Sequence, residues 1–285
     1  MVKLTIYSDL TWPEIEEKLK ETKMVLMPTG SVEQHGHHVG VGADWIQAWE
    51  IAKRAGEKSG ALVLPIMCYG VSGHHKEFPG VITLTFDTYK IVVFEILQSL
   101  NRYGVEKVLF INGHGGNTSA ITEACKEARE EYGMICAISH WWDILSSEKI
   151  FGHPPMQHAG YAETALTLAS RPEAVRMKKA KLTSTRQVDD EIQFTHPGLA
   201  HFKGGNIRIP LRVIDVTNTG SMTEAHPDEV LGTEDYSMIT PDYAEKLMEK
   251  VVDWLCEFIP HFEQLTIPEV ERIYFDIHIL LQFEF

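Results

Sequence analysis

The sequence predicts an α/β protein, a three-layer α/β/α sandwich built around a mostly parallel sheet. Short apolar runs alternate along the chain with helix-like segments of roughly ten to sixteen residues, which is the pattern of βαβ units with helices on both faces of a sheet. Only about six strands can be counted, so an eight-stranded barrel of the usual ~250 residues is the weaker interpretation.

The helices are predicted from capping signals and from apolar residues at helical spacing. Thr11-Trp12-Pro13-Glu14 has the form of a capping box with proline in the first turn, so a helix is expected from Trp12 to Glu21. The same criteria predict further helices at Ala43 to Lys58, at Asp87 to Tyr103 with Asp87 as its cap, and at Thr118 to Tyr132. Glycines placed to end these helices follow them at Gly60, Gly104 and Gly133.

Strands are predicted where short apolar runs lie between turn signals, at Met24 to Pro28, Ala61 to Met67, Val81 to Phe86, Val108 to Ile111 and Met134 to Ser139. From Arg171 to Thr240 the periodicity weakens, and we expect loops and short strands that cover a functional site. Pro241 opens a last helix to about Ile259, which Pro260 is expected to stop.

The domain prediction is a single domain over residues 1–264 followed by a tail over residues 265–285. Ile273 to Phe285 is apolar and rich in strand-forming residues, so a free edge there would favour aggregation. We therefore expect the tail to pack on the body or on a neighbouring subunit.

Composition limits the classes of partner. The 285 residues are 44% hydrophobic and carry a formal net charge of −14, which argues against nucleic acid and anionic lipid as partners. The basic run from Arg176 to Arg186 has no aromatic residues among its charges and is interpreted as a solvated face. Four cysteines without a CxxC pair, no signal peptide and no apolar run of roughly 20 residues predict a soluble, cytoplasmic protein with no membrane partner.

Carboxylates and imidazoles gather in one early stretch of the chain. In an extended segment Glu33, His35 and His37 point to one side, while Gln34 points to the other. Asp44 stands at the start of the next helix, where a carboxylate can bridge two divalent ions.

His114 adds an imidazole just after a predicted strand, at the carboxyl edge where α/β proteins bind ligands. Taken singly, these residues could be surface histidines and helix caps, but the whole set indicates a metal centre. Mixed oxygen and nitrogen donors suit zinc, manganese or iron(II). Two ions about 3.5 to 4 Å apart can hold a hydroxide and polarise a carbonyl together.

A second set follows at His158 and Glu163. His158 precedes a predicted helix, and a histidine of near-neutral pKa can carry a proton from the metal-bound water to a leaving nitrogen. Glu163 lies one turn inside that helix and either completes the metal shell or orients His158.

These motifs resemble the creatininase (creatinine amidohydrolase) family. The resemblance rests on four segments: Gly30-Ser31-Val32-Glu33-Gln34-His35-Gly36, Gly42-Ala43-Asp44, Gly113-His114-Gly115-Gly116-Asn117 and His158-Ala159-Gly160 with Glu163-Thr164. It implies an α/β/α sandwich, two divalent metal ions per chain (Zn, Mn or Fe) and a homo-oligomer, often a hexamer. By the resemblance, Glu33 and His114 bind one ion, His35 binds the other, and Asp44 bridges them.

The chain also departs from the creatinine-cleaving members of that family. Those members have a tyrosine and a metal-binding glutamate where this chain has Gly115 and Gly116, so Glu163 or water is the candidate fifth ligand. They also place an aromatic and an acidic residue where this chain has Pro154 and Pro155. The sequence therefore favours a substrate other than creatinine.

Candidate substrate-binding residues lie in two further segments. Ser72, His74 and His75 precede Phe78-Pro79-Gly80 and loosely match a family substrate loop, with Ser72 as a hydrogen-bond donor. Trp141 and Trp142 follow a predicted strand and either wall the pocket or serve in packing.

The leading hypothesis is hydrolysis of a cyclic or small amide by hydroxide bound to the two metal ions, with a small molecule as substrate and His158 as acid and base. The alternatives are hydrolytic opening of a ring ketone such as a diketo-inositol, metal-dependent isomerisation of a sugar, and a catalytically idle metal-binding subunit.

Overall fold

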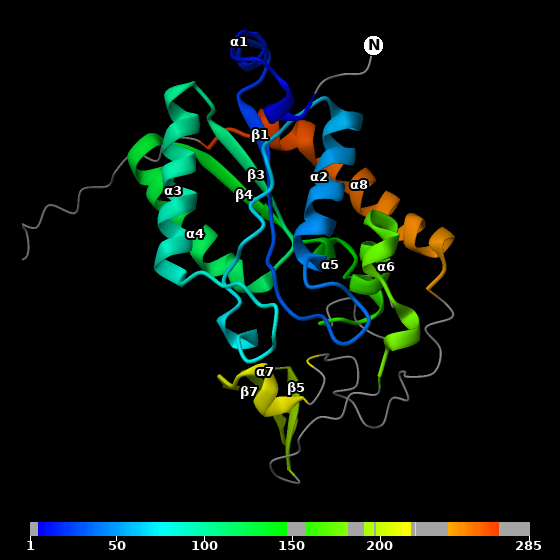
Figure 1. The fold of residues 1–285 in the computed structure, drawn as a ribbon. Coiled ribbons are helices and arrows are strands. Elements are labelled where there is room, and N and C mark those ends of the chain that lie inside the picture. Colours follow the sequence, from blue (N-terminus) through cyan, green and yellow to red (C-terminus); the bar gives the residue numbers. More distant parts are fainter. Residues whose placement is uncertain are drawn as a thin grey trace, which may run out of the picture.

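The computed structural model describes residues 5–146, 158–181, 191–196, 198–217, 220 and 239–267. At its centre lies a parallel sheet with strand order β2-β1-β3-β4 (Figure 1). The strands are β1 (Met24–Thr29), β2 (Leu62–Val63), β3 (Lys107–Asn112) and β4 (Ile135–Ser139). Strands β1 and β3 pair along their whole length, from Met24 with Lys107 to Thr29 with Asn112. The loops that follow β1 and β3 therefore leave the same edge of the sheet side by side.

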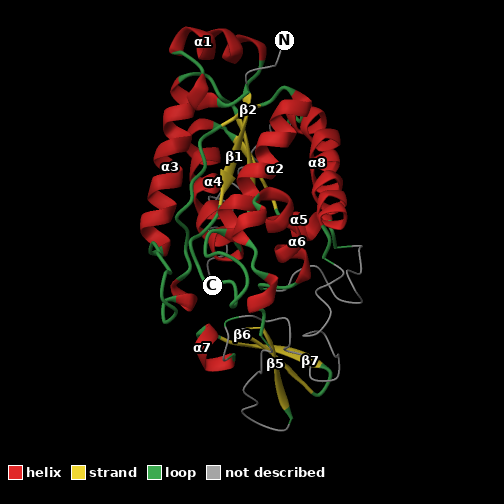
Figure 2. Cartoon of the chain, turned by 45° about the vertical axis from the view of Figure 1, so that its right-hand side comes forward, coloured by secondary structure: helices red, strands yellow, loops and turns green. Residues whose placement is uncertain are grey.

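Alternating side chains of these strands form two cores, one on each face of the sheet. Met24 and Leu26 join a core with α2 (Ala43–Ser59), α5 (Trp141–Ile144), α6 (Tyr161–Ser170) and α8 (Pro241–Gln264). Val25 and Met27 join the other core with α1 (Trp12–Glu21), α3 (Phe86–Arg102) and α4 (Thr118–Tyr132). Figures 1 and 2 show the resulting layers, and the predicted three-layer α/β/α sandwich is confirmed.

A smaller antiparallel sheet occupies part of the region where short strands were expected. It consists of β5 (Ile192–His196), β6 (Gly198–Phe202) and β7 (Gly205–Ile209), followed by α7 (Val213–Val216). Figure 2 shows this sheet outside the three main layers. Arg212, just before α7, forms an ion pair of 3.1 Å with Glu77 and so connects this region to the loop after Ser72 and His75.

The remaining short segments are 3₁₀ turns, at Tyr7–Asp9, Gly73–His75, Gly115–Asn117, Pro172–Ala174 and Met177–Lys179.

Several boundaries agree with the sequence signals. Helices α1 and α4 have the predicted bounds, and Thr11 and Glu14 form the expected capping box at the start of α1. Gly60 and Gly133 follow α2 and α4 with φ of 89° and 71°, in the left-handed region that glycine adopts without strain.

Other local predictions were wrong. Within the described part of the chain, the segment Val81 to Phe86 makes only isolated bridges, at Ile82 and Thr83, because it runs outside the sheet and exposes Ile82. The cap of α3 is Thr85, whose side chain accepts the N–H of Thr88, and not Asp87. The apolar run from Ala61 to Met67 supplies only the two residues of β2 and a bridge at Met67.

Pro260 does not stop the last helix, since α8 continues to Gln264. Proline removes one helical hydrogen bond, but here it lies within the last turns, where tertiary contacts hold the helix. Phe262 is buried, and Glu263 is contacted by Thr22 and Lys107.

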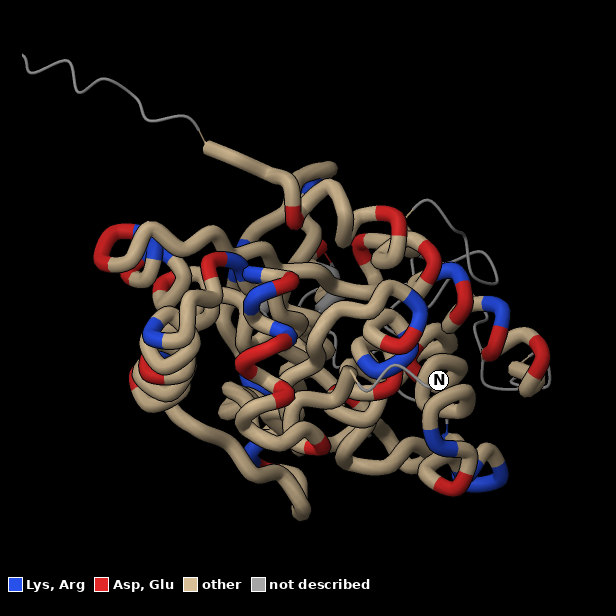
Figure 3. Tube along the Cα trace, turned by 90° about the horizontal axis from the view of Figure 1, so that it is seen from above, with Lys and Arg blue, Asp and Glu red and all other residues tan. Residues whose placement is uncertain are grey.

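Charged residues of both signs lie along the surface. Viewed from above, Lys and Arg are interspersed among Asp and Glu on the part of the chain that the structure describes (Figure 3). The described part of the basic run is exposed at Arg176, Lys178, Lys179 and Lys181, as expected of a solvated face. Among the described residues, no helix has the length and apolar character needed to span a bilayer.

Residues 182–186 of the basic run, Pro154, Pro155 and the tail from residue 268 onward lie outside the described residues.

Candidate metal centre

Acidic and imidazole side chains from two loops and the start of a helix meet at the carboxyl edge of the sheet. Glu33 and His35 follow β1, Asp44 lies in the first turn of α2, and His114 follows β3. The loop after β3 approaches α2 closely, because a Cβ on Gly113 would lie 2.2 Å from the carbonyl oxygen of Asp44. Only glycine permits that approach.

Helix α6 contributes the second predicted set. Glu163 lies in its first turn, and His158 lies just before it. The Glu163 carboxylate accepts the N–H of Ala159, so it also fixes the backbone next to His158.

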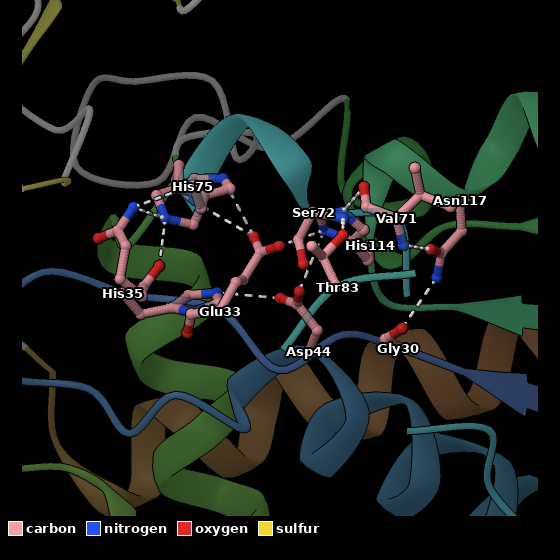
Figure 4. A network of polar contacts seen from close by, with 12 residues as sticks. Gly30, Glu33, His35, Asp44, Val71, Ser72, His75, Thr83, His114 and Asn117 are labelled. Atoms are coloured by element: carbon pink, nitrogen blue, oxygen red, sulfur yellow. Dashed lines mark hydrogen bonds and ion pairs between the residues drawn. The ribbon is translucent and has the colours of Figure 1, made fainter. Parts of the chain in front are cut away.

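Asp44 is the centre of the cluster (Figure 4). Its Oδ1 lies 2.9 Å from His35 Nε2, and its Oδ2 lies 3.1 Å from His114 Nδ1. Glu33 Oε2 lies 3.2 Å from the same nitrogen of His114, and Glu163 Oε2 lies 3.5 Å from His35 Nε2. All five residues are buried.

The donor atoms fall into groups with the spacing of metal ligands. Glu33, Asp44 and His114 form one group, and His35, Asp44 and Glu163 form another, so Asp44 belongs to both. In each group the donor atoms lie within 4.8 Å of one another. A third group joins Glu33 and His35 to His158.

Backbone carbonyls fix the orientation of the two central histidines. His35 Nδ1 lies 3.2 Å from the carbonyl oxygen of Glu33, and His114 Nε2 lies 3.0 Å from that of Val71. A carbonyl only accepts, so these ring nitrogens are the N–H donors. The other nitrogen of each neutral ring therefore points its lone pair at the carboxylates.

In this arrangement the lone pairs of His35 and His114 and the nearby carboxylate oxygens point at the same positions. Glu33 Oε2 and Asp44 Oδ2 are buried without a hydrogen bond within the described part of the chain. Buried acceptors of this kind require a cation or a proton between them. Oxygen and nitrogen donors in these numbers fit a divalent metal ion in each of the two groups that share Asp44.

The pKa shifts of His35 and His114 also indicate that this cluster favours an added positive charge. Burial opposes protonation of His35, but the charges of Asp44, Glu163 and Glu33 outweigh it and raise the pKa of His35 to about 10. For His114, burial is likewise outweighed by Glu33 and Asp44, and its pKa is raised well above the usual value. Without a metal ion, an added proton on each histidine supplies the missing cation.

The pKa values of the carboxylates depend on the same opposing effects of burial and neighbouring charge. Burial would raise the pKa of Asp44, but the charges of His35 and His114 beside its two oxygens lower it. Burial dominates at Glu33 and Glu163, raising the pKa of Glu33 and bringing that of Glu163 to about 7.

The predicted substrate residues differ in their placement. Ser72 is fully buried, and its Oγ has no hydrogen bond among the described residues. His75 reaches the cluster, with its Nε2 at 3.3 Å from Glu33 Oε1, and its neighbour His74 stacks on His114. Trp142 instead packs in the hydrophobic core and stacks on His140.

The predicted sides of His37 and Gln34 were wrong. His37 does not share a face with Glu33 and His35, because the chain turns at Gly36, with φ of 61°, and leaves His37 exposed. Conversely, Gln34 is buried in the site and contacts His75 and His158. The strand-like alternation that placed Gln34 on the opposite side does not hold in a turning loop.

His38 is a further residue of the site, and the sequence motifs do not single it out. It is buried, and its Nε2 lies 2.9 Å from the Thr164 hydroxyl, so it connects the loop after β1 to α6. Its place beside other histidines in the sequence was the available signal.

Fold and site together define a class of protein: an α/β/α sandwich with a buried cluster of carboxylates and histidines, spaced as metal ligands, at the carboxyl edge of its sheet. The profile of the creatininase family, described as creatinine amidohydrolase, matches residues 8–259. The chain belongs to the creatininase family, whose members include hydrolases of carbon–nitrogen bonds.

Three relatives show the range of the family. Creatinine amidohydrolase of Pseudomonas putida is 32% identical over 199 residues, which are 63% of this chain and 76% of that protein. Mycofactocin precursor peptide peptidase of Mycolicibacterium smegmatis is 30% identical over 162 residues, 53% of this chain and 60% of that protein. The 3-dehydro-scyllo-inosose hydrolase of Thermotoga maritima is 24% identical over 266 residues, 87% of this chain and 80% of that protein.

A solved structure of creatinine amidohydrolase (creatininase) has the same fold. The two superimpose with a TM-score of 0.72 at 24% identity, covering 92% of this chain and 99% of that one.

The glycines after His114 allow a matched test of the centre. A Cβ on Gly116 would lie 2.2 Å from the Val71 carbonyl oxygen and 2.4 Å from His114 Nε2, whereas a Cβ on Gly115 would meet no atom of the described residues within 4 Å. Gly116→Ala should therefore break the hydrogen bond that orients His114 and lower zinc affinity by roughly 10- to 100-fold. Gly115→Ala should bind zinc like the wild type in calorimetric titration, and equal affinities for both variants would contradict this account.

His38 predicts a pH dependence of stability. Burial, followed by the charges of His35 and His37, lowers the pKa of His38 to about 4. A histidine with a depressed folded pKa stabilises the fold above its unfolded pKa of about 6.5, and that contribution is lost as the pH falls toward 4. Between pH 7 and pH 5 the metal-free wild type should lose roughly 2 kcal/mol more unfolding free energy than His38→Gln. Urea unfolding at both pH values tests this, and equal losses would refute it.

Proposed function

We propose that this protein is a dinuclear metal-dependent amidohydrolase that opens a cyclic amide or cleaves a small amide. The proposal rests above all on Asp44, whose two carboxylate oxygens face two different histidines. A carboxylate in that position is suited to bridge two ions.

The two groups of donor atoms that share Asp44 indicate which residues would bind each ion. Glu33, Asp44 and His114 would hold one ion, and His35, Asp44 and Glu163 the other. Ions bound there supply Lewis acidity, which lowers the pKa of water and polarises a carbonyl. Two fold neighbours, a manganese form of creatininase and a creatininase mutant of "Zn-Zn type", support manganese or zinc, and iron(II) suits the same donors.

His158 is the proposed acid and base. Its Nε2 lies 2.7 Å from the Gln34 carbonyl oxygen and its Nδ1 lies 3.7 Å from Glu33 Oε1, so one edge of the ring is anchored and the other faces the centre. Burial, followed by the charge of His35, lowers the pKa of His158 and favours the neutral form, which can accept a proton. Nδ1 would take a proton from the attacking water and deliver it to the leaving nitrogen.

Ser72 and His75 are the proposed substrate contacts. The Ser72 side chain is buried and lies beside His114 (Figure 4), so its Oγ could donate a hydrogen bond to a substrate oxygen or nitrogen. His75 presents its Nε2 beside Glu33. The proposed substrate role of Trp142 is weaker, since this side chain packs in the core.

The substrate is proposed to be larger than creatinine. Where creatinine-cleaving members of the family carry a tyrosine, Gly115 faces open space within the described part of the chain. Gly115 directly follows His114 in the chain and is exposed, so the space beside it could accept a bulkier group. The peptidase among the relatives is consistent with an amide of greater size.

Hydrolytic opening of a ring ketone is the second candidate. The relative named 3-dehydro-scyllo-inosose hydrolase matches 87% of this chain, more than the amide-cleaving relatives reported above. The same centre would polarise a ketone in place of an amide.

We further propose that the protein is a homo-oligomer in the cytoplasm and that residues 1–264 form a single domain. Analytical sedimentation tests the oligomeric state, and limited proteolysis tests the extent of the domain.

A substrate panel distinguishes the two candidates. Zinc- and manganese-loaded protein is incubated with cyclic amides, small linear amides, short peptides and diketo-inositols. Release of an amine or a new amino group supports the amidohydrolase, and formation of an acid alone supports ketone opening. No turnover of any compound by protein carrying two ions would count against both.

Matched substitutions of Glu163 and His158 distinguish a metal ligand from a proton carrier. Glu163→Gln should lower the metal content from about two ions per chain to about one, because a neutral amide is a weak ligand. His158→Gln should keep both ions and lower kcat by roughly 10²- to 10⁴-fold. The exposed Glu173→Gln is the control. Elemental analysis and kinetics give both results, and loss of metal from His158→Gln would make His158 a ligand instead.

A further inference from the structure

Gln34 lies between the two histidines that border the proposed reaction centre. Its Nε2 is 2.7 Å from His75 Nδ1, 2.9 Å from His158 Nε2 and 2.9 Å from the carbonyl oxygen of Gly220. Its Oε1 accepts the N–H of Gly36 at 3.0 Å. The side chain is buried.

The two backbone partners fix the orientation of the amide. Gly36 offers a donor and Gly220 an acceptor, so the oxygen must face Gly36 and the nitrogen must face Gly220. The reverse orientation would pair two donors on one side and two acceptors on the other. A Cβ on Gly220, which has φ of 85°, would lie 1.9 Å from Gln34 Oε1, so this contact also requires glycine.

The orientation of the amide determines where the proton lies on His75. Because Gln34 Nε2 donates, His75 Nδ1 must accept, and a neutral His75 carries its proton on Nε2. That N–H points to the side of Glu33, whose Oε1 lies 3.3 Å away.

The main chain of Gln34 determines the proton on His158. The Gln34 carbonyl oxygen lies 2.7 Å from His158 Nε2 and can only accept, so Nε2 carries the proton and the lone pair belongs to Nδ1. The two amide hydrogens are used by Gly220 and His75, so the 2.9 Å separation from His158 Nε2 is a contact between two donors.

We propose that Gln34 is a positioning residue that sets complementary proton arrangements on two histidines, a donor N–H on His75 and a lone pair on His158 Nδ1. This inference rests on the proposed hydrolytic function and deepens it. A lone pair on His158 suits removal of a proton from the attacking water. A preset N–H on His75 suits stabilisation of the negative charge that develops on the substrate oxygen.

Histidine-selective ¹⁵N NMR tests the proposal directly, on purified protein with and without zinc. Long-range proton–nitrogen spectra distinguish the two neutral tautomers, and His75→Gln and His158→Gln assign the signals. Wild-type His75 is expected to carry its proton on Nε2. A proton on Nδ1 of His75 would overturn the proposal without any variant of Gln34.

Gln34→Glu supplies the second readout. The carboxylate has the same size but only accepts, so it should draw a proton to Nδ1 of His75 and change the His75 signals. The kcat should fall roughly 10-fold or more with unchanged zinc content and little change in KM. Gln98→Glu, which alters a glutamine bound to the Tyr132 hydroxyl, is the matched control and should leave both unchanged.

Wild-type signals and kcat in Gln34→Glu, or loss of zinc from that variant, would overturn the positioning role. The tautomers and the zinc content are measured without substrate, so they remain informative if the proposed amide activity fails. Zinc binding with the expected tautomers but no amide turnover would reject the reaction and leave the role of Gln34 intact.

Discussion

The structure depends on the burial of three carboxylates, Glu33, Asp44 and Glu163, at the carboxyl edge of the sheet. Each buried charge costs several kcal/mol unless a countercharge balances it. His35 and His114 face these oxygens with lone pairs whose direction two backbone carbonyls fix. Such a cluster is stable only with added protons or with metal ions. The loops after β1 and β3 meet there because β1 and β3 pair in register, and close approaches at glycine let them pack.

The layered fold could be predicted from the sequence, because apolar periodicity and capping signals are local. Helices α1 and α4 followed such signals to the residue. The errors arose where tertiary contacts override local preference. The segment Val81 to Phe86 has strand-forming residues but, among the described residues, no strand that pairs with it along its length. Helix α8 passes Pro260 because the buried Phe262 stabilises the last turn.

The chemical identity of the site could be predicted better than its geometry. Glu33, His35, Asp44, His114 and Glu163 could be named from residue type and motif, and the structure brings all five together. The side from which each residue enters could not be predicted, since a loop that turns at Gly36 has no strand alternation. The sequence therefore misplaced His37 and Gln34. The partners of Gln34, His75 and Gly220, are distant in sequence, and no local pattern indicates such contacts.

The central claim is that Asp44 bridges two metal ions. Anomalous-scattering maps of crystals grown with manganese test it most directly, because they locate each ion independently of any assay. The account predicts two peaks about 3.5 to 4 Å apart, with one Asp44 oxygen on each. His114 and Glu33 should contact one peak, and His35 and Glu163 the other. A single peak, or two peaks without Asp44 as their common ligand, would contradict it.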